Sequence, residues 1–170
     1  MWRIFYRSVD AVSLALGWVA GGLILCIALM IMAEILLRNL AGISLTFVWE
    51  ISAYFHIAAI FLGLAFTLRT GGHIQVAILQ RPLGRLFELV STLGGLVISA
   101  YLSLALVRLC LNWASTGRTS GTVDNIPLAW PMTLVAVGAC LLTLQLLLRL
   151  VHLLTGAPHE LPWGAGPSAE

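Results

Sequence analysis

The chain alternates between four long apolar stretches and short polar connections. The apolar stretches cover residues 11–37, 45–68, 86–111 and 128–154. Because an α-helix rises about 1.5 Å per residue, about 20 residues are enough to cross the hydrocarbon of a bilayer. The apolar positions are continuous rather than alternating, which excludes the strands of a membrane β-barrel. The pattern therefore predicts an all-α fold, an integral membrane four-helix bundle over residues 1–157.

The connection after the second stretch contains a glycine pair and then a polar segment. Gly71 and Gly72 supply residues that end a helix. The apolar residues of the following segment can share one helical face while its polar residues stay in water. We therefore expect a short interfacial element between the second and third spans, which Pro82 ends.

The last connection and the C-terminal segment are also polar. Residues 112–125 are rich in Ser, Thr, Gly and Asn, the composition of a loop. Pro127 then suits the first turn of the fourth helix. Residues 158–170 contain several prolines and glycines, and we expect them to form a disordered cytoplasmic tail.

Composition excludes a water-soluble fold and several classes of function. Apolar residues make up 60% of the 170 positions and charged residues only 9%, so the chain cannot cover a core with a charged shell. Membrane lipid must be its solvent. The net charge of +2 gives no basic stripe for a nucleic acid. The three cysteines lie inside apolar stretches without the paired spacing of a metal site or a disulfide framework.

The arginines and tryptophans predict the orientation of the helices. If both termini lie inside, six arginines fall on the cytoplasmic side and three fall outside, as the positive-inside rule favours. Trp49, Trp113 and Trp130 then lie at the outer boundary, where amphipathic rings prefer to sit. The sequence predicts that both termini are cytoplasmic.

A charged cluster is expected at the outer ends of the first two spans. Glu34 and Arg38 lie one helical turn apart, and Arg38 could also reach Glu50 across the short connection. An ion pair there could clamp the helical hairpin. Together with Trp49, the same residues could instead dock another protein.

No catalytic or cofactor-binding set is evident. His56 lies well inside the second span, where it could relay protons, bind a metal or hydrogen-bond a neighbouring helix. Haem needs a second ligand well inside a facing helix, and the sequence contains no other histidine well inside a span. Packing against a neighbouring helix is therefore the favoured interpretation of His56. We expect no enzyme, no cofactor and no metal site.

Glycine pairs mark two candidate helix-packing surfaces. Gly17 and Gly21 are spaced as small-xxx-small on the first span, and Gly94 and Gly95 form a flat patch on the third. Small residues at such positions allow helices to approach closely.

Four motifs in a fixed order resemble a known family. They are Arg38 at the end of the first span, Phe47-Val48-Trp49-Glu50 at the start of the second, Gly71-Gly72-His73-Ile74 after it, and Asn125-Ile126-Pro127 before the fourth. With the four spans and the chain length, they resemble the small permease subunit of TRAP transporters, the DctQ-type family. The likeness covers residues 6–154. One departure is Ile51, where many relatives have a second acidic residue.

The resemblance implies a role in transport. TRAP systems are secondary transporters of the bacterial inner membrane, usually sodium-coupled, that take up organic acids with a soluble periplasmic binding protein. The small subunit is similar to a scaffold for the large permease subunit, which houses the substrate site. Besides this large subunit and lipid, the binding protein is an expected partner, with Arg118, Asp124 and Asn125 as candidate contacts.

Two other functions remain open. A self-sufficient four-span exporter would need a carboxylate in the middle of the first span, whereas Glu34 lies near its end. A membrane assembly factor or anchor protein is the second alternative. The sequence offers no mid-membrane carboxylate, no broken span and no inverted repeat of the kind that transporters use for substrate sites.

Overall fold

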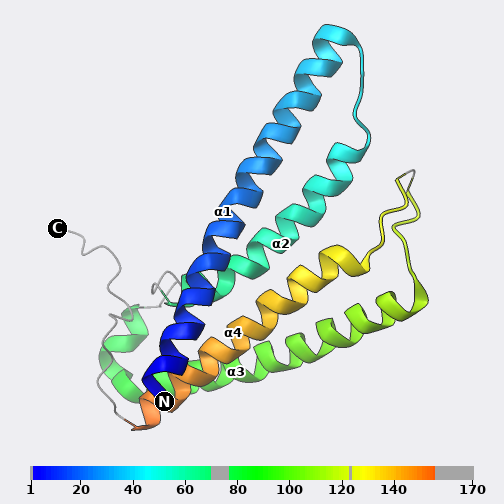
Figure 1. The fold of residues 1–170 in the computed structure, drawn as a ribbon. Coiled ribbons are helices and arrows are strands. Elements are labelled where there is room, and N and C mark those ends of the chain that lie inside the picture. The colour runs from blue at the N-terminus through cyan, green and yellow to red at the C-terminus, as the bar shows by residue number, and fades with distance from the viewer. Residues whose placement is uncertain (1, 70–76, 123, 156–170) are drawn as a thin grey trace, which may run out of the picture.

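The computed structural model describes residues 2–69, 77–122 and 124–155, without the side chains of residues 2–7, 10, 69, 77–85 and 87. It contains four helices: α1 (Trp2–Ala41), α2 (Phe47–Arg69), α3 (Ala77–Thr116) and α4 (Ala129–Thr155) (Figure 1). Each helix includes a segment long and apolar enough to cross a membrane: Ala11–Ala41, Phe47–Leu68, Glu88–Thr116 and Ala129–Thr155. The predicted all-α fold with four spanning helices is confirmed.

The helix ends differ from the sequence prediction in α1, α3 and α4. α1 begins already at Trp2, and Pro127 is not in the first turn of the fourth helix as predicted but lies before it, since α4 begins at Ala129. The segment before the third span is not a separate element, because α3 is helical from Ala77 and continues through Pro82. At its other end α3 runs to Thr116, so part of the predicted loop is helical. The predicted Gly71, Gly72 and His73 motif and the tail of residues 158–170 lie outside the described residues.

The helices form two antiparallel hairpins that meet along α2 and α4. α1 packs on α2, α3 packs on α4, and α2 packs on α4. The hairpins converge where α1 begins and α4 ends, which we call the termini end, and diverge toward the two short connections, which we call the loop end (Figure 1). In the described part of the chain, α3 packs extensively only against α4. α1 and α3 are therefore the two edge helices.

The contact between the hairpins depends on a glycine that the sequence analysis did not select. A Cβ at Gly138 of α4 would overlap the backbone carbonyl of Phe61 and lie 2.8 Å from the backbone nitrogen of Leu62, both on α2. Ala58 and Ala65 on the same helix are fully buried. Small residues thus let the backbones of α2 and α4 touch, as is typical of membrane helices.

In each of the two predicted glycine pairs, one glycine faces a neighbouring helix and the other faces outward. A Cβ at Gly17 would lie 2.8 Å from the ring of Phe66 on α2, and one at Gly95 would lie 3.7 Å from Leu146 on α4. No atom lies within 4 Å of a Cβ built at Gly21 or Gly94. One glycine of each pair therefore packs within the chain, and the other faces away from it.

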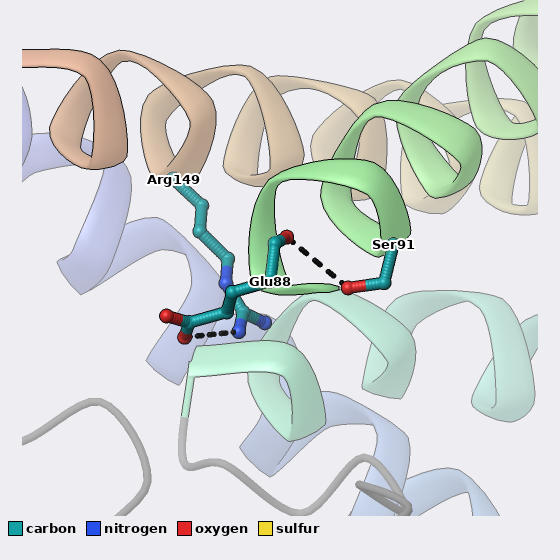
Figure 2. A network of polar contacts seen from close by, with 3 residues as sticks. All are labelled: Glu88, Ser91 and Arg149. Atoms are coloured by element: carbon teal, nitrogen blue, oxygen red, sulfur yellow. Dashed lines mark hydrogen bonds and ion pairs between the residues drawn. The ribbon is translucent and has the colours of Figure 1, made fainter. Parts of the chain in front are cut away.

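Polar side chains join the helices at the termini end. The Gln145 amide donates to Ser13 Oγ at 2.8 Å, linking α4 to α1, and both residues are fully buried. The Arg149 guanidinium pairs with Glu88 at 3.1 Å, linking α4 to α3 (Figure 2). The sequence analysis did not anticipate either link. Interhelical hydrogen bonds of this kind stabilise membrane proteins by about 0.6 kcal/mol each on average.

Replacing Gly138 with leucine should destabilise the fold. The added side chain must push the backbones of α2 and α4 apart, and overpacking typically costs about 1–3 kcal/mol. The matched control is Gly21→Leu, since a side chain at Gly21 meets no atom within 4 Å. Thermal unfolding of the purified proteins in detergent would measure the difference. Equal melting temperatures would show that the α2–α4 contact does not limit stability.

Candidate functional site

The short α1–α2 connection is fastened to α1 by a buried carboxylate. Glu34 is only 1% exposed, and it accepts hydrogen bonds from the backbone N–H of Leu45 at 2.7 Å and from Ser44 Oγ at 3.1 Å. Gly42 has a positive φ of 67°, which allows the chain to turn after α1. Glu34 therefore satisfies donors of the connection that the turn would otherwise leave without partners.

Arg38 does not form the predicted ion pair. In the described part of the structure, no ion pair joins it to Glu34 or Glu50, and its side chain is exposed. Glu34 instead accepts hydrogen bonds from the connection, and Glu50 accepts them from Tyr54 and Thr122. Arg38 lies in the last turn of α1, where a positive charge is favourable at the helix C-terminus.

Glu50 connects the two hairpins at the loop end. It lies in the first turn of α2 and accepts hydrogen bonds from Tyr54 Oη at 2.7 Å and from Thr122 Oγ1 at 2.5 Å. Thr122 belongs to the α3–α4 connection, which reaches back toward the start of α2 (Figure 1). Glu50 thus bridges the gap that opens between the diverging hairpins.

The α3–α4 connection is an ordered turn rather than an irregular loop. An isolated antiparallel bridge pairs Thr119 with Pro127, and the Ser120 N–H donates to the Ile126 carbonyl at 3.0 Å. Asn125 adopts a positive φ of 46°, a conformation that asparagine tolerates better than most residues. These backbone contacts hold the tip of the connection in place, so Thr122 is presented to Glu50.

The predicted contact residues of this connection face outward. Arg118, Asp124 and Asn125 are all exposed. The guanidinium of Arg118 lies 5.8 Å from the centre of the Trp113 ring, within the range of a cation–π interaction. The structure therefore presents a positive and a negative side chain on one compact turn.

Tryptophans surround the loop end. Trp49 is 62% exposed and Trp130 is 77% exposed, while Trp113 is half-buried beneath Arg118. All three lie near the helix ends at the loop end, at the start of α2, the end of α3 and the start of α4. Tryptophan at such positions is typical of a membrane–water boundary.

The described residues do not form a metal site. No group of three or more His, Cys, Asp or Glu among them could hold a metal ion. His56, for which packing against a neighbouring helix was favoured, is exposed on α2 instead. The loop end therefore combines exposed charged and aromatic side chains with a hydrogen-bonded turn.

The hydrogen-bond donors that Glu34 and Glu50 accept from were not predicted from the sequence. Tyr54 follows Glu50 by one helical turn, so the i, i+4 spacing could have suggested that contact. Thr122 is 72 residues from Glu50, and no local signal points to their contact.

Replacing Glu34 with alanine should destabilise the α1–α2 hairpin more than replacing Arg38 with alanine. The first change leaves the partly buried N–H of Leu45 without its acceptor, which costs about 1 kcal/mol. The second removes an exposed side chain, with an expected effect within about 0.5 kcal/mol. Thermal unfolding in detergent would measure both variants. A larger loss of thermal stability in Arg38→Ala than in Glu34→Ala would support the predicted ion pair instead.

The comparisons with known proteins bear on the whole four-helix unit. The searches of curated proteins and of solved structures returned no match. Residues 27–156, from within α1 to the end of α4, match the family described as tripartite ATP-independent periplasmic transporters, DctQ component. This match covers most of the chain and agrees with the likeness of the four motifs. The chain therefore belongs to the DctQ family of TRAP transporter components.

Proposed function

We propose that this chain is a non-catalytic membrane subunit that scaffolds the large permease subunit of a TRAP transporter. The match of residues 27–156 to the DctQ component carries the proposal. The described structure supports it, because large apolar side chains are exposed along all four helices and leave broad surfaces for lipid and for a membrane partner. Contacts such as Gly138 with Phe61 and Gln145 with Ser13 would keep these surfaces in a fixed relation.

The scaffold would be the stationary part of the transporter. On this proposal, the large subunit carries the substrate and sodium sites, and the complex takes up an organic acid across the bacterial inner membrane. Both termini would be cytoplasmic, which places the loop end in the periplasm. The exposed Trp49 and Trp130 at that end support this placement at a membrane boundary.

The loop end would then meet the periplasmic binding protein. Arg38, Arg118 and Asp124 are exposed there. The Thr122–Glu50 hydrogen bond holds the α3–α4 connection against α2, so these charges would be presented on an ordered surface. Charges on the rim of an interface chiefly steer association, and their effect falls as salt concentration rises.

Reconstitution separates a scaffold from a self-sufficient exporter. The chain, the large permease and the binding protein would be placed in proteoliposomes together and in every pair. We expect uptake of the organic acid, driven by a sodium gradient, only when all three are present. Transport by this chain alone would contradict the proposal and favour the exporter. A chain that neither transports nor co-purifies with the large permease would instead favour the assembly or anchor alternative.

Charge reversal tests the contact with the binding protein. In the complete system, the variants Arg118→Glu and Asp124→Arg would be tested. Each should raise the concentration of binding protein needed for half-maximal uptake by about threefold to tenfold. The reason is that each mismatched charge at the rim weakens association by about 1 kcal/mol. Uptake at saturating binding protein serves as the internal control and should not change. Unaltered half-saturation at low salt in both variants would exclude these residues from the contact.

A further inference from the structure

The two edge helices present different surfaces to the membrane. On α1, the exposed side chains between Ala11 and Leu37 are glycines and apolar residues, and the indole N–H of Trp18, near the termini end, is the one hydrogen-bonding side-chain group among them. On α3, Tyr101, Arg108 and Asn112 are exposed in a region that is otherwise mostly apolar. Lipid tails suit the first surface but cannot satisfy the polar groups of the second.

The polar residues of α3 form one stripe that points away from the rest of the chain. The spacing of Tyr101, Arg108 and Asn112 places them on a single helical face. The opposite face carries Ser99 and Ser103, which are buried, and Ser103 bonds Thr143 of α4 at 2.8 Å. Because α3 packs extensively only against α4 in the described structure, the stripe has no cover within this chain.

The depth of Tyr101 makes lipid an unfavourable cover for it. Tyr101 lies about 18 Å along the helix axis from Trp113, the tryptophan at the loop end of α3. With Trp113 at the boundary and α3 along the membrane normal, Tyr101 would lie close to the middle of a hydrocarbon layer about 30 Å thick, out of reach of the headgroups. The Tyr101 side chain is 77% exposed. A hydroxyl in hydrocarbon without a hydrogen-bond partner costs at least about 1–3 kcal/mol.

Two residues on the same face of α3 as Tyr101 indicate what kind of partner could cover this face. Arg108 lies between Tyr101 and the loop end, where its five donors suit a carboxylate. Gly94 lies on the other side of Tyr101, and no atom is within 4 Å of a Cβ built there, so a second helix could approach the backbone closely.

We propose that the α3 stripe of Gly94, Tyr101, Arg108 and Asn112 is the docking surface for one transmembrane helix of the large permease subunit. This helix would place a hydrogen-bond acceptor opposite Tyr101 and a carboxylate opposite Arg108. The inference rests on the proposed function and adds to it the face that meets the partner. It assigns the apolar outer face of α1 to lipid.

Site-specific photocrosslinking tests the assignment. A benzophenone amino acid would be placed at Tyr101 or, as the control, at Leu25, which is 61% exposed on α1. Both variants would be co-expressed with the large permease and irradiated in membranes. We expect a crosslink to the large permease from position 101 and none from position 25. Equal crosslinking from both positions, or a product from position 101 with lipid or a second copy of this chain only, would overturn the inference.

Co-purification of substituted complexes supplies the second measurement. Tyr101→Leu combined with Gly94→Leu removes the hydroxyl and fills the gap, and should lower recovery of the large permease by about tenfold, equivalent to about 1.4 kcal/mol. The control pair, Leu25→Ala with Gly21→Leu, should leave recovery unchanged. Recovery equal to wild type in the α3 variant would overturn the assigned face. Failure of the wild-type chain to co-purify would instead count against the proposed function.

Discussion

The backbone contact between α2 and α4 at Gly138 is the constraint on which the arrangement of the helices depends. The packing of α2 on α4 is the most extensive contact between the two hairpins in the described chain, and it brings Gly138 against the peptide of Phe61 and Leu62. In a membrane, burial of apolar surface provides little driving force between helices, so close van der Waals contact must take its place. A larger residue at Gly138 would separate the hairpins. Two hydrogen bonds that join the hairpins, Gln145–Ser13 and Thr122–Glu50, would then be stretched or broken.

Polar contacts stabilise the arrangement of the helices at both ends of the molecule. At the termini end, where the hairpins converge, Gln145 of α4 reaches Ser13 of α1 directly, while the Arg149–Glu88 pair joins α4 to α3 within one hairpin. At the loop end the helices are further apart (Figure 1), and the α3–α4 connection must fold back to bring Thr122 to Glu50. The same divergence explains why an ordered turn is needed there, and why its charged residues are held at the surface.

The sequence predicted the spans well because lipid imposes a strong and local requirement for length and apolarity. It also allowed the family to be recognised from motifs whose order is preserved. The partners of polar residues were less predictable. Glu34 was expected to pair with Arg38 one turn away, but it accepts hydrogen bonds from the backbone N–H of Leu45 and from Ser44 instead. The Glu50–Thr122 contact depends on how the hairpins diverge, which no periodicity in either segment encodes.

Hydrophobicity cannot distinguish a lipid-facing surface of such a chain from a protein-facing one, since both are apolar. Hydrogen-bonding groups can, because hydrocarbon offers no partner for them while a neighbouring helix does. By this criterion the outer faces of α1 and α3 are not equivalent, although both helices lie at an edge and have similar length. A hydroxyl in hydrocarbon without an acceptor costs at least about 1–3 kcal/mol, and a helix that supplies an acceptor opposite Tyr101 removes this cost. The DctQ family works as part of a larger transporter. The need for a hydrogen-bond acceptor opposite Tyr101 therefore favours α3 as the helix on which another subunit packs.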